Sequence, residues 1–211
     1  MSQTFGKTRW KRFAVVMVPT IAATAAVGVS IAQGALAASF SVSGIPAKVT
    51  AGQLTGTDFV QYGTIDFHDA AHQGGAFPVA VSGFKTATIH NMCQSVPIKT
   101  PLGTYTLTIT AGGDANKPVT AENLYLDMTD LKAQSAVFHG INIGVAAGGV
   151  TKGTTNPQDA GKIDPTGFAQ EADSADLTGV EQQSWATSAG TFTLNGMHLS
   201  IAAGDTPCPS F

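Results

Sequence analysis

Two histidines four residues apart form the pattern in this sequence that comes closest to a catalytic metal site. They belong to the segment His68-Asp69-Ala70-Ala71-His72. On a helix this spacing presents both imidazoles to a zinc ion, and a metalloprotease also needs a glutamate base next to the first histidine. Here the shorter Asp69 would misplace that base, and the adjacent Gly74-Gly75 disfavours a helix. We therefore expect an exposed polar turn and no metal at this segment.

A serine esterase of the α/β-hydrolase type would need the pentapeptide G-x-S-x-G, which exposes the nucleophile on a strained turn. The sequence does not contain it, and the nearest stretch, residues 183–190, lacks both glycines in register. A Ser–His–Asp set assembled by the fold stays open, because such triads recur on unrelated folds. The phosphate-binding glycine loops and the EF-hand spacing are also missing. The sequence therefore predicts no catalytic residue, no metal ligand and no cofactor.

The two cysteines of the chain, Cys93 and Cys208, are the remaining reactive side chains. An even number of cysteines in an exported chain favours a disulfide. Two free thiols are the alternative, and a metal site is disfavoured because neither cysteine has a CxxC partner. The bond would fix the C-terminal end onto the middle of the chain. In the chain-entropy model it would stabilise the fold by up to ~4–5 kcal/mol.

The charges of the chain are divided unevenly along its length. The 211 residues carry a formal charge of −3, yet Lys7, Arg9, Lys11 and Arg12 all precede the first acid, Asp58. Of the 11 Lys and Arg, seven remain after residue 12 against 14 Asp and Glu, a net charge of −7. An acidic body without arginine has no surface suited to a phosphate backbone. We expect no nucleic-acid partner.

An uncharged, mostly apolar stretch, Phe13–Ala38, follows the basic cluster directly. This layout is typical of an N-terminal hydrophobic helix that directs export. The small residues Ala35 and Ala37 predict signal cleavage, which would leave a mature chain starting near Ala38. The stretch also exceeds the roughly 20 residues that span a bilayer, so an uncleaved anchor is the alternative. Residues 1–38 are therefore a signal peptide or a membrane anchor, and residues 39–211 an extracytoplasmic domain, either secreted or held at the outer face of the cytoplasmic membrane.

The domain shows the period-2 alternation of β-strands. Tyr105, Leu107 and Ile109 alternate with threonines, and similar runs begin near Leu124 and Phe192. Glycines inside such runs, as in Val81-Ser82-Gly83-Phe84, predict bends or close backbone approach. We predict an all-β fold, a single elongated or curved antiparallel β-sheet or sandwich-like domain. Residues 146–170, dense in Gly, Thr and Pro, are predicted to form a flexible loop.

Six sequence blocks, spread over nearly the whole chain, carry a resemblance to known proteins. They are TRWKRFAVVMVP, QGALAASFSVSG, FVQYG, NMCQS, GFAQEADSA and WATSAGTF. Together they resemble a family of exported actinobacterial proteins without an assigned function. Its members often carry the automatic label "cholesterol esterase". The resemblance supplies no catalytic residues.

The function expected from these features is that of a non-catalytic exported protein of the cell envelope. An apolar strand face must pack on a second sheet or on a ligand, so an incompletely closed sheet would offer a groove to a lipid or an acyl chain. The expected partners are the membrane, through an uncleaved N-terminal helix, a lipid ligand, or another membrane protein. The alternative is a secreted lipid or sterol esterase.

Overall fold

The computed structural model describes residues 44–67 and 75–211. The export stretch with Ala35, Ala37 and Ala38, and the pair His68 and His72, lie outside the described residues. The described residues belong to one unit, Ser41–Phe211.

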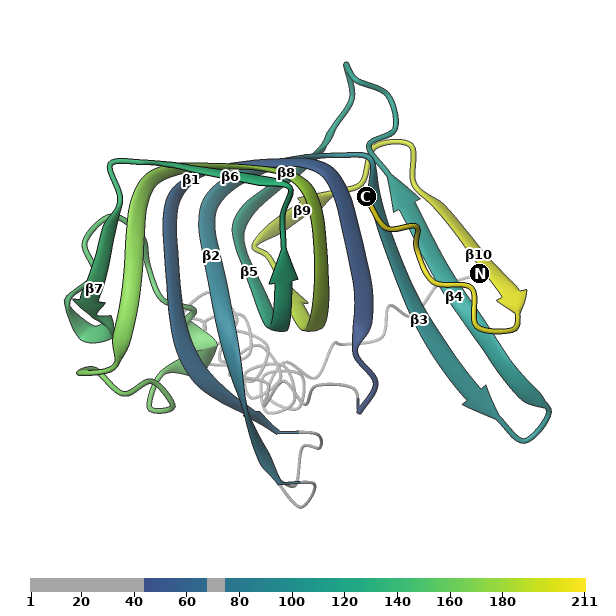
Figure 1. Ribbon diagram of the computed structural model, residues 1–211, viewed down its shortest axis with the longest axis horizontal. Coiled ribbons are helices and arrows are strands. Elements are labelled where there is room, and N and C mark those ends of the chain that lie inside the picture. Colours follow the sequence, from purple (N-terminus) through teal and green to yellow (C-terminus); the bar gives the residue numbers. More distant parts are fainter. Residues whose placement is uncertain (1–43, 68–74) are drawn as a thin grey trace, which may run out of the picture. The chain divides into compact units, whose positions relative to one another are not determined.

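Ten strands and two short 3₁₀ helices make up the described chain, and every strand pairing is antiparallel (Figure 1). The predicted all-β antiparallel fold is confirmed. The strands are β1 (Ala47–Phe67), β2 (Ala76–His90), β3 (Met92–Thr100), β4 (Gly103–Ala111), β5 (Val119–Lys132), β6 (Ser135–His139), β7 (Asn142–Ala146), β8 (Phe168–Ser188), β9 (Thr191–Thr193) and β10 (His198–Ala203), and the 3₁₀ helices are η1 (Ala147–Gly149) and η2 (Pro157–Asp159).

Four long strands close the sheet into a ring. β1 pairs with β2, β2 with β5, β5 with β8, and β8 again with β1. Closure pairs each of these strands on both edges over part of its length, and it gives the sheet an inner and an outer face. We call these four strands the ring.

The far edge of β8 is lined by one nearly continuous arm of the chain. The partners Lys132–Glu181, Ser135–Thr178 and Asn142–Glu171 continue the same register from β5 through β6 into β7. Between β5 and β6, the Gln134 N–H still donates to the Thr178 carbonyl at 2.9 Å. The apparent gaps between these strands are therefore local bends in a single long pairing.

Left-handed residues inside the long strands change which side chains face inward. Asn123 has φ 50° within β5. Before Asn123, the core residue is Ala121, and after it the core residue is Leu124. The residues that face inward therefore change from odd to even numbers at Asn123. Gly179, with φ 58°, makes the same change in β8. A left-handed residue interrupts the period-2 alternation, which bends the strand and breaks its pattern in the sequence.

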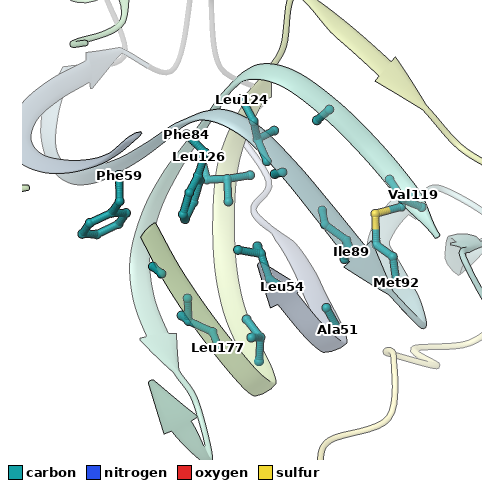
Figure 2. Packing of buried hydrophobic residues seen from close by; sticks show 14 of the residues in the cluster. Ala51, Leu54, Phe59, Phe84, Ile89, Met92, Val119, Leu124, Leu126 and Leu177 are labelled. Carbon is teal, nitrogen blue, oxygen red and sulfur yellow. The ribbon is translucent and has the colours of Figure 1, made fainter. Parts of the chain in front are cut away.

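The inner face holds the main hydrophobic core. Figure 2 shows side chains of β1, β2, β5 and β8 directed toward the same space. The buried members include Leu54, Phe84, Val119, Leu124 and Leu126. This core is assembled from segments distant in sequence, which only ring closure brings together.

The outer face of the ring is covered by the segment between β7 and β8. Val60, Tyr62, Val81 and Tyr125 form a second cluster there, packed against residues of this segment such as Val150 and Ile163. The segment lies within residues 146–170, where a flexible loop is predicted, and it contains η1 and η2. Its flexibility stays a prediction.

Three strands, β3, β4 and β10, leave the ring side by side as an extension (Figure 1). The predicted alternation of β4 is present, but the covered face is the threonine face: Thr106 is 1% exposed. The C-terminal segment, residues 204–211, crosses this face. There Thr106 Oγ1 donates to the Gly204 carbonyl at 2.8 Å and accepts from the Thr206 N–H at 2.9 Å. The apolar face of the extension is left partly exposed, because the C-terminal segment satisfies hydroxyl groups on the other side.

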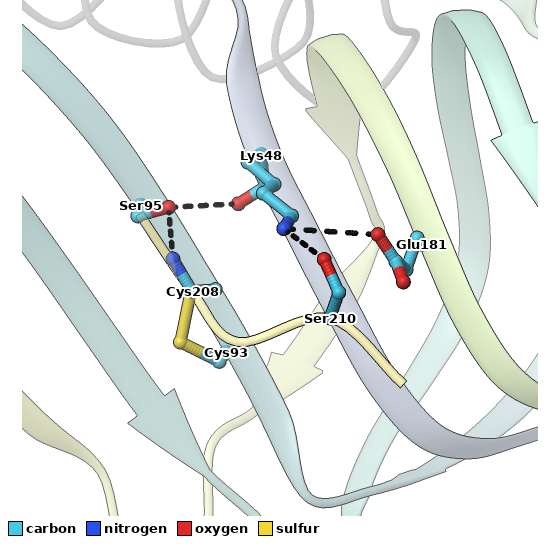
Figure 3. Close-up of a disulfide and its surroundings, with 6 residues drawn as sticks. All are labelled: Lys48, Cys93, Ser95, Glu181, Cys208 and Ser210. Atoms are coloured by element: carbon cyan, nitrogen blue, oxygen red, sulfur yellow. Dashed lines mark hydrogen bonds and ion pairs between the residues drawn. A yellow bond between two sulfur atoms is a disulfide. The ribbon is translucent and has the colours of Figure 1, made fainter. Parts of the chain in front are cut away.

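The C-terminal segment is tied to the extension by the cysteine pair expected from the sequence (Figure 3). Cys93 and Cys208 lie at disulfide distance, with a Cα–Cα separation of 5.9 Å. Beside them the Cys208 N–H donates to Ser95 Oγ at 2.9 Å. The bond closes a chain segment of 115 residues.

Gly56 provides a test of the packing inside the ring. A Cβ placed on it would lie 2.3 Å from Cδ1 of Phe84. We expect Gly56→Ala to lower the free energy of unfolding by about 1–3 kcal/mol, the usual cost of overpacking a core. Urea unfolding measures it. Gly63→Ala on the same strand, with nothing within 4 Å of its added Cβ, is the matched control and should change stability by less than about 0.5 kcal/mol. Equal effects of the two substitutions would contradict this packing.

Candidate functional site

An apolar cavity of about 220 Å³ lies within the inner face of the ring. Every ring strand contributes to it, and β6 with the turn before it closes one side. Its lining residues are Leu54, Phe59, Gln61, Ser82, Phe84, Leu126, Met128, Leu131, Ala133, Ala136, Phe138, Leu177, Val180 and Gln182. Eleven of these fourteen side chains are apolar, so the space suits an apolar ligand.

Aromatic rings form one wall of this cavity. Phe59 of β1 lies between Phe84 and Phe138, with ring centroids at 5.3 Å and 5.1 Å. The missing side chain of Gly56 leaves room for the Phe84 ring. Ring contacts of this kind fix the wall in place, because tilted aromatic pairs are favoured over loose packing.

Three polar side chains lie at the cavity. Gln61 Nε2 donates to Ser82 Oγ at 2.8 Å, and Gln170 Nε2 donates to Gln61 Oε1 at 2.5 Å. Gln182 is 5% exposed and lines both this cavity and the neighbouring groove. Its amide therefore marks the polar end of the cavity.

A groove of about 430 Å³ lies near the cavity, and the two share the lining residue Gln182. It runs between the ring and the extension, and the C-terminal residues Asp205 and Pro207 form part of its lining. Lys48 Nζ lies in it, 3.7 Å from Glu181 Oε2 and 2.8 Å from Ser210 Oγ (Figure 3). The groove is charged where the cavity is apolar, so together they offer an amphipathic space.

A second candidate site, on the outer face, is a cluster of buried acids. Asp66 of β1 and Asp127 of β5 are both buried, and Asp159 of η2 packs against them. The Tyr62 hydroxyl donates to Asp159 Oδ2 at 2.7 Å and accepts from the Asn156 N–H at 2.9 Å. Lys162 Nζ, 3.9 Å from Asp159 Oδ1, is the nearby cation.

The acids of this cluster hold protons more tightly than in water. Burial, then the charges of Asp66 and Asp159, raises the pKa of Asp127 to about 8. Burial and the charge of Asp159 raise the pKa of Asp66, and burial raises that of Asp159. Protonated Asp127 can donate to Asp66. Asp66 Oδ2 and Asp127 Oδ1 are buried without a hydrogen-bond partner. Burial and the neighbouring carboxylates therefore favour the protonated form of Asp127.

Burial also raises the pKa of Tyr62, and the charge of Asp159 adds to this effect, so the Tyr62 hydroxyl stays a hydrogen-bond donor.

Within residues 44–67 and 75–211, no group of three or more His, Cys, Asp or Glu side chains is arranged to hold a metal ion. In those same ranges, no helix is long and apolar enough to cross a membrane.

A serine, a histidine and an aspartate also meet, where β6 pairs with β8. His139 and Ser174 are directly opposite each other in the register. His139 Nε2 lies 3.5 Å from Asp176 Oδ2, and Thr55 Oγ1 donates to Asp176 Oδ1 at 2.8 Å. His139 is exposed, and this set lines neither the cavity nor the groove.

Of the residues singled out in the sequence, the structure brings together Cys93 and Cys208. The acid cluster has no signal in the sequence beyond single acids inside apolar runs, such as Leu126-Asp127-Met128. It also could not show that His139 and Ser174 meet, because 35 positions separate them and only the register of β6 on β8 pairs them.

The comparisons with known proteins give one result. A family model matches residues 43–209, and it describes a family of unknown function. No curated protein and no solved structure matches the chain.

The acid cluster makes stability depend on pH in a defined direction. An acid whose pKa is raised by folding stabilises the fold below its unfolded value, near 4, and that stability is lost as pH rises through the folded value, about 8 for Asp127. Glu171 acts in the opposite direction at acidic pH, because N–H groups of Lys152 and Thr151 lower its pKa to about 2.

We expect Asp127→Asn to abolish most of the stability loss between about pH 4 and about pH 8 and to make the variant more stable than the parent at alkaline pH. The amide keeps the shape and can still donate to Asp66. Urea unfolding across this pH range measures the effect, with the exposed Asp130→Asn on the same strand as control. Parallel pH profiles for the parent and Asp127→Asn would contradict the raised pKa of Asp127.

Proposed function

The chain belongs to the family of unknown function DUF6230, and from its cavity we propose that it is a non-catalytic, exported protein of the cell envelope that binds the apolar part of a lipid. The single observation that supports this proposal most strongly is the cavity inside the ring. Its apolar walls would take an acyl chain, and Gln182 with the adjoining groove would take the polar part of the ligand.

The size of the cavity limits the ligand. An apolar cavity of about 150 Å³ stays dry and takes up benzene. The space here, about 220 Å³, is larger, but it falls below the roughly 300 Å³ at which pockets for drug-sized molecules begin. It suits one short apolar segment, such as the end of a single acyl chain, rather than a whole membrane lipid.

Two observations support export. The uncharged stretch Phe13–Ala38 follows a basic cluster, as in export signals. The pair Cys93 and Cys208 at disulfide distance fits an oxidising compartment outside the cytoplasm. Under this proposal the domain is either secreted or anchored at the outer face of the cytoplasmic membrane. In the anchored form, the N-terminal helix would contact the membrane or another membrane protein.

Filling the cavity tests the proposal. Ala136 of β6 lines the cavity at its exposed rim, whereas its neighbour Val137, also exposed, does not line it. We expect the parent chain to bind a fluorescent fatty acid and to retain lipid in native mass spectrometry. Ala136→Phe should weaken binding at least about tenfold, because a ring that occupies the space excludes the chain. Val137→Phe, with the same side chain added one position away, is the control.

Absence of fatty-acid binding and of retained lipid in the parent chain would overturn the proposed function. Equal binding by the parent and Ala136→Phe would show that lipid binds elsewhere.

The alternative function, a secreted lipid or sterol esterase, is favoured by one arrangement, the meeting of Ser174, His139 and Asp176. Against it, an esterase needs donors that stabilise an oxyanion in a site closed to water, and His139 lies on an exposed surface. We expect the folded chain neither to hydrolyse acyl esters nor to react with a fluorophosphonate probe. Labelling that is lost in Ser174→Ala and kept in Ser135→Ala would establish the esterase instead.

A further inference from the structure

The apolar face of the extension carries a continuous patch. In the register of β3, β4 and β10, Val96 lies opposite Leu107 and Leu107 opposite Ile201. The next rows place Ile109 beside Leu199, and Tyr105 beside Ile98 and Ala203. The C-terminal segment covers the other face, so nothing among the described residues packs over these side chains.

The exposure of this face rises toward the end of the extension. Ile201 is 63% exposed, and Leu102, in the turn between β3 and β4, is 89% exposed. A contiguous exposed apolar face is unusual for a soluble domain and marks an interaction site. An exposed leucine at the tip of a hairpin is suited to insertion into an apolar phase.

The charges of the extension favour one kind of partner. Between Met92 and Ala111, and between Met197 and Gly204, the single charged side chain is Lys99, near Leu102. These stretches contain no acid, although the chain after residue 12 has a net charge of −7. Tyr105 lies on the apolar face, and Lys99, paired with Thr104, lies on the opposite face near the tip. A tyrosine and a lysine at the border of an apolar surface match the boundary between acyl chains and anionic headgroups.

We propose that the extension docks on a membrane surface, with the face formed by Leu107, Ile109, Leu199 and Ile201 against the bilayer and Leu102 inserted among the acyl chains. This inference rests on the proposed function only in requiring that the domain is exported, and it does not depend on the cavity. Lys99 would reach the anionic headgroups.

The test places a tryptophan at the tip of the extension in the full chain. Leu102→Trp is reconstituted with vesicles of phosphatidylcholine and phosphatidylglycerol in which part of the phosphatidylcholine carries a spin label on its acyl chain. Residues 13–38 can hold the chain on vesicles by themselves, so the readout is local quenching rather than binding. The control is Ile143→Trp, on β7, where the replaced isoleucine is 66% exposed. The parent chain gives the background of Trp10 and Trp185.

We expect a loss of fluorescence for Leu102→Trp beyond the parent background, and none for Ile143→Trp. Adding Ile201→Asp to Leu102→Trp should abolish this loss, because a carboxylate on the face opposes burial in lipid. Equal quenching at both positions, or none at position 102, would overturn the proposal. So would a concentration-dependent dimer that protects Leu102→Trp from aqueous quenchers without lipid. Adding Ala136→Phe to Leu102→Trp should leave the quenching unchanged. A failure of the cavity proposal and a failure of this one are therefore distinguishable.

Discussion

Pairing between β1 and β8 is the interaction on which the rest of the structure depends. The other ladders would leave an open sheet, and this one joins residues 47–62 to residues 169–184 and closes it. Closure places Leu54 of β1 and Leu177 of β8 in one core and in the wall of the same cavity. It also separates the two candidate sites, since the inner face receives the apolar cavity and the outer face the buried acids.

The long strands serve both faces because they are bent at defined residues. After Asp58, with φ 50°, Phe59 points into the inner core, while Val60 and Tyr62 belong to the outer cluster. Tyr62 then reaches Asp159, which fixes η2 over the acids. The covering segment keeps water from Asp66 and Asp127, and burial is the main cause of their raised pKa values. The raised pKa values of the two acids are thus a consequence of how this segment packs.

Local sequence patterns were sufficient to predict the all-β class, several of the strands and the disulfide, but not the two longest strands, β1 and β8, nor the features that depend on pairing between distant segments. The alternation around Leu107 is visible because β4 has no left-handed residue inside it. In β5, Asn123 shifts the alternation, so its inward residues follow no single period. The alternation also could not tell which face of β4 is covered, because Thr106 is buried by a segment about 100 residues away in the chain. The cavity and the acid cluster follow from ring closure, which leaves no local pattern.

The extension depends on the disulfide for its position. Only three residue pairs, Lys48–Ser95, Val49–Gln94 and Thr50–Cys93, join it to β1. So short a ladder is a weak hinge, since each pair contributes little against the freedom of the strands it orders. The C-terminal segment adds a second attachment through Cys208, the Ser210–Lys48 hydrogen bond and the Phe211 N–H on Glu181 (Figure 3). Because the groove lies between the extension and the ring, its width is set by this attachment. Reduction of the Cys93–Cys208 bond would therefore loosen the extension and with it the groove.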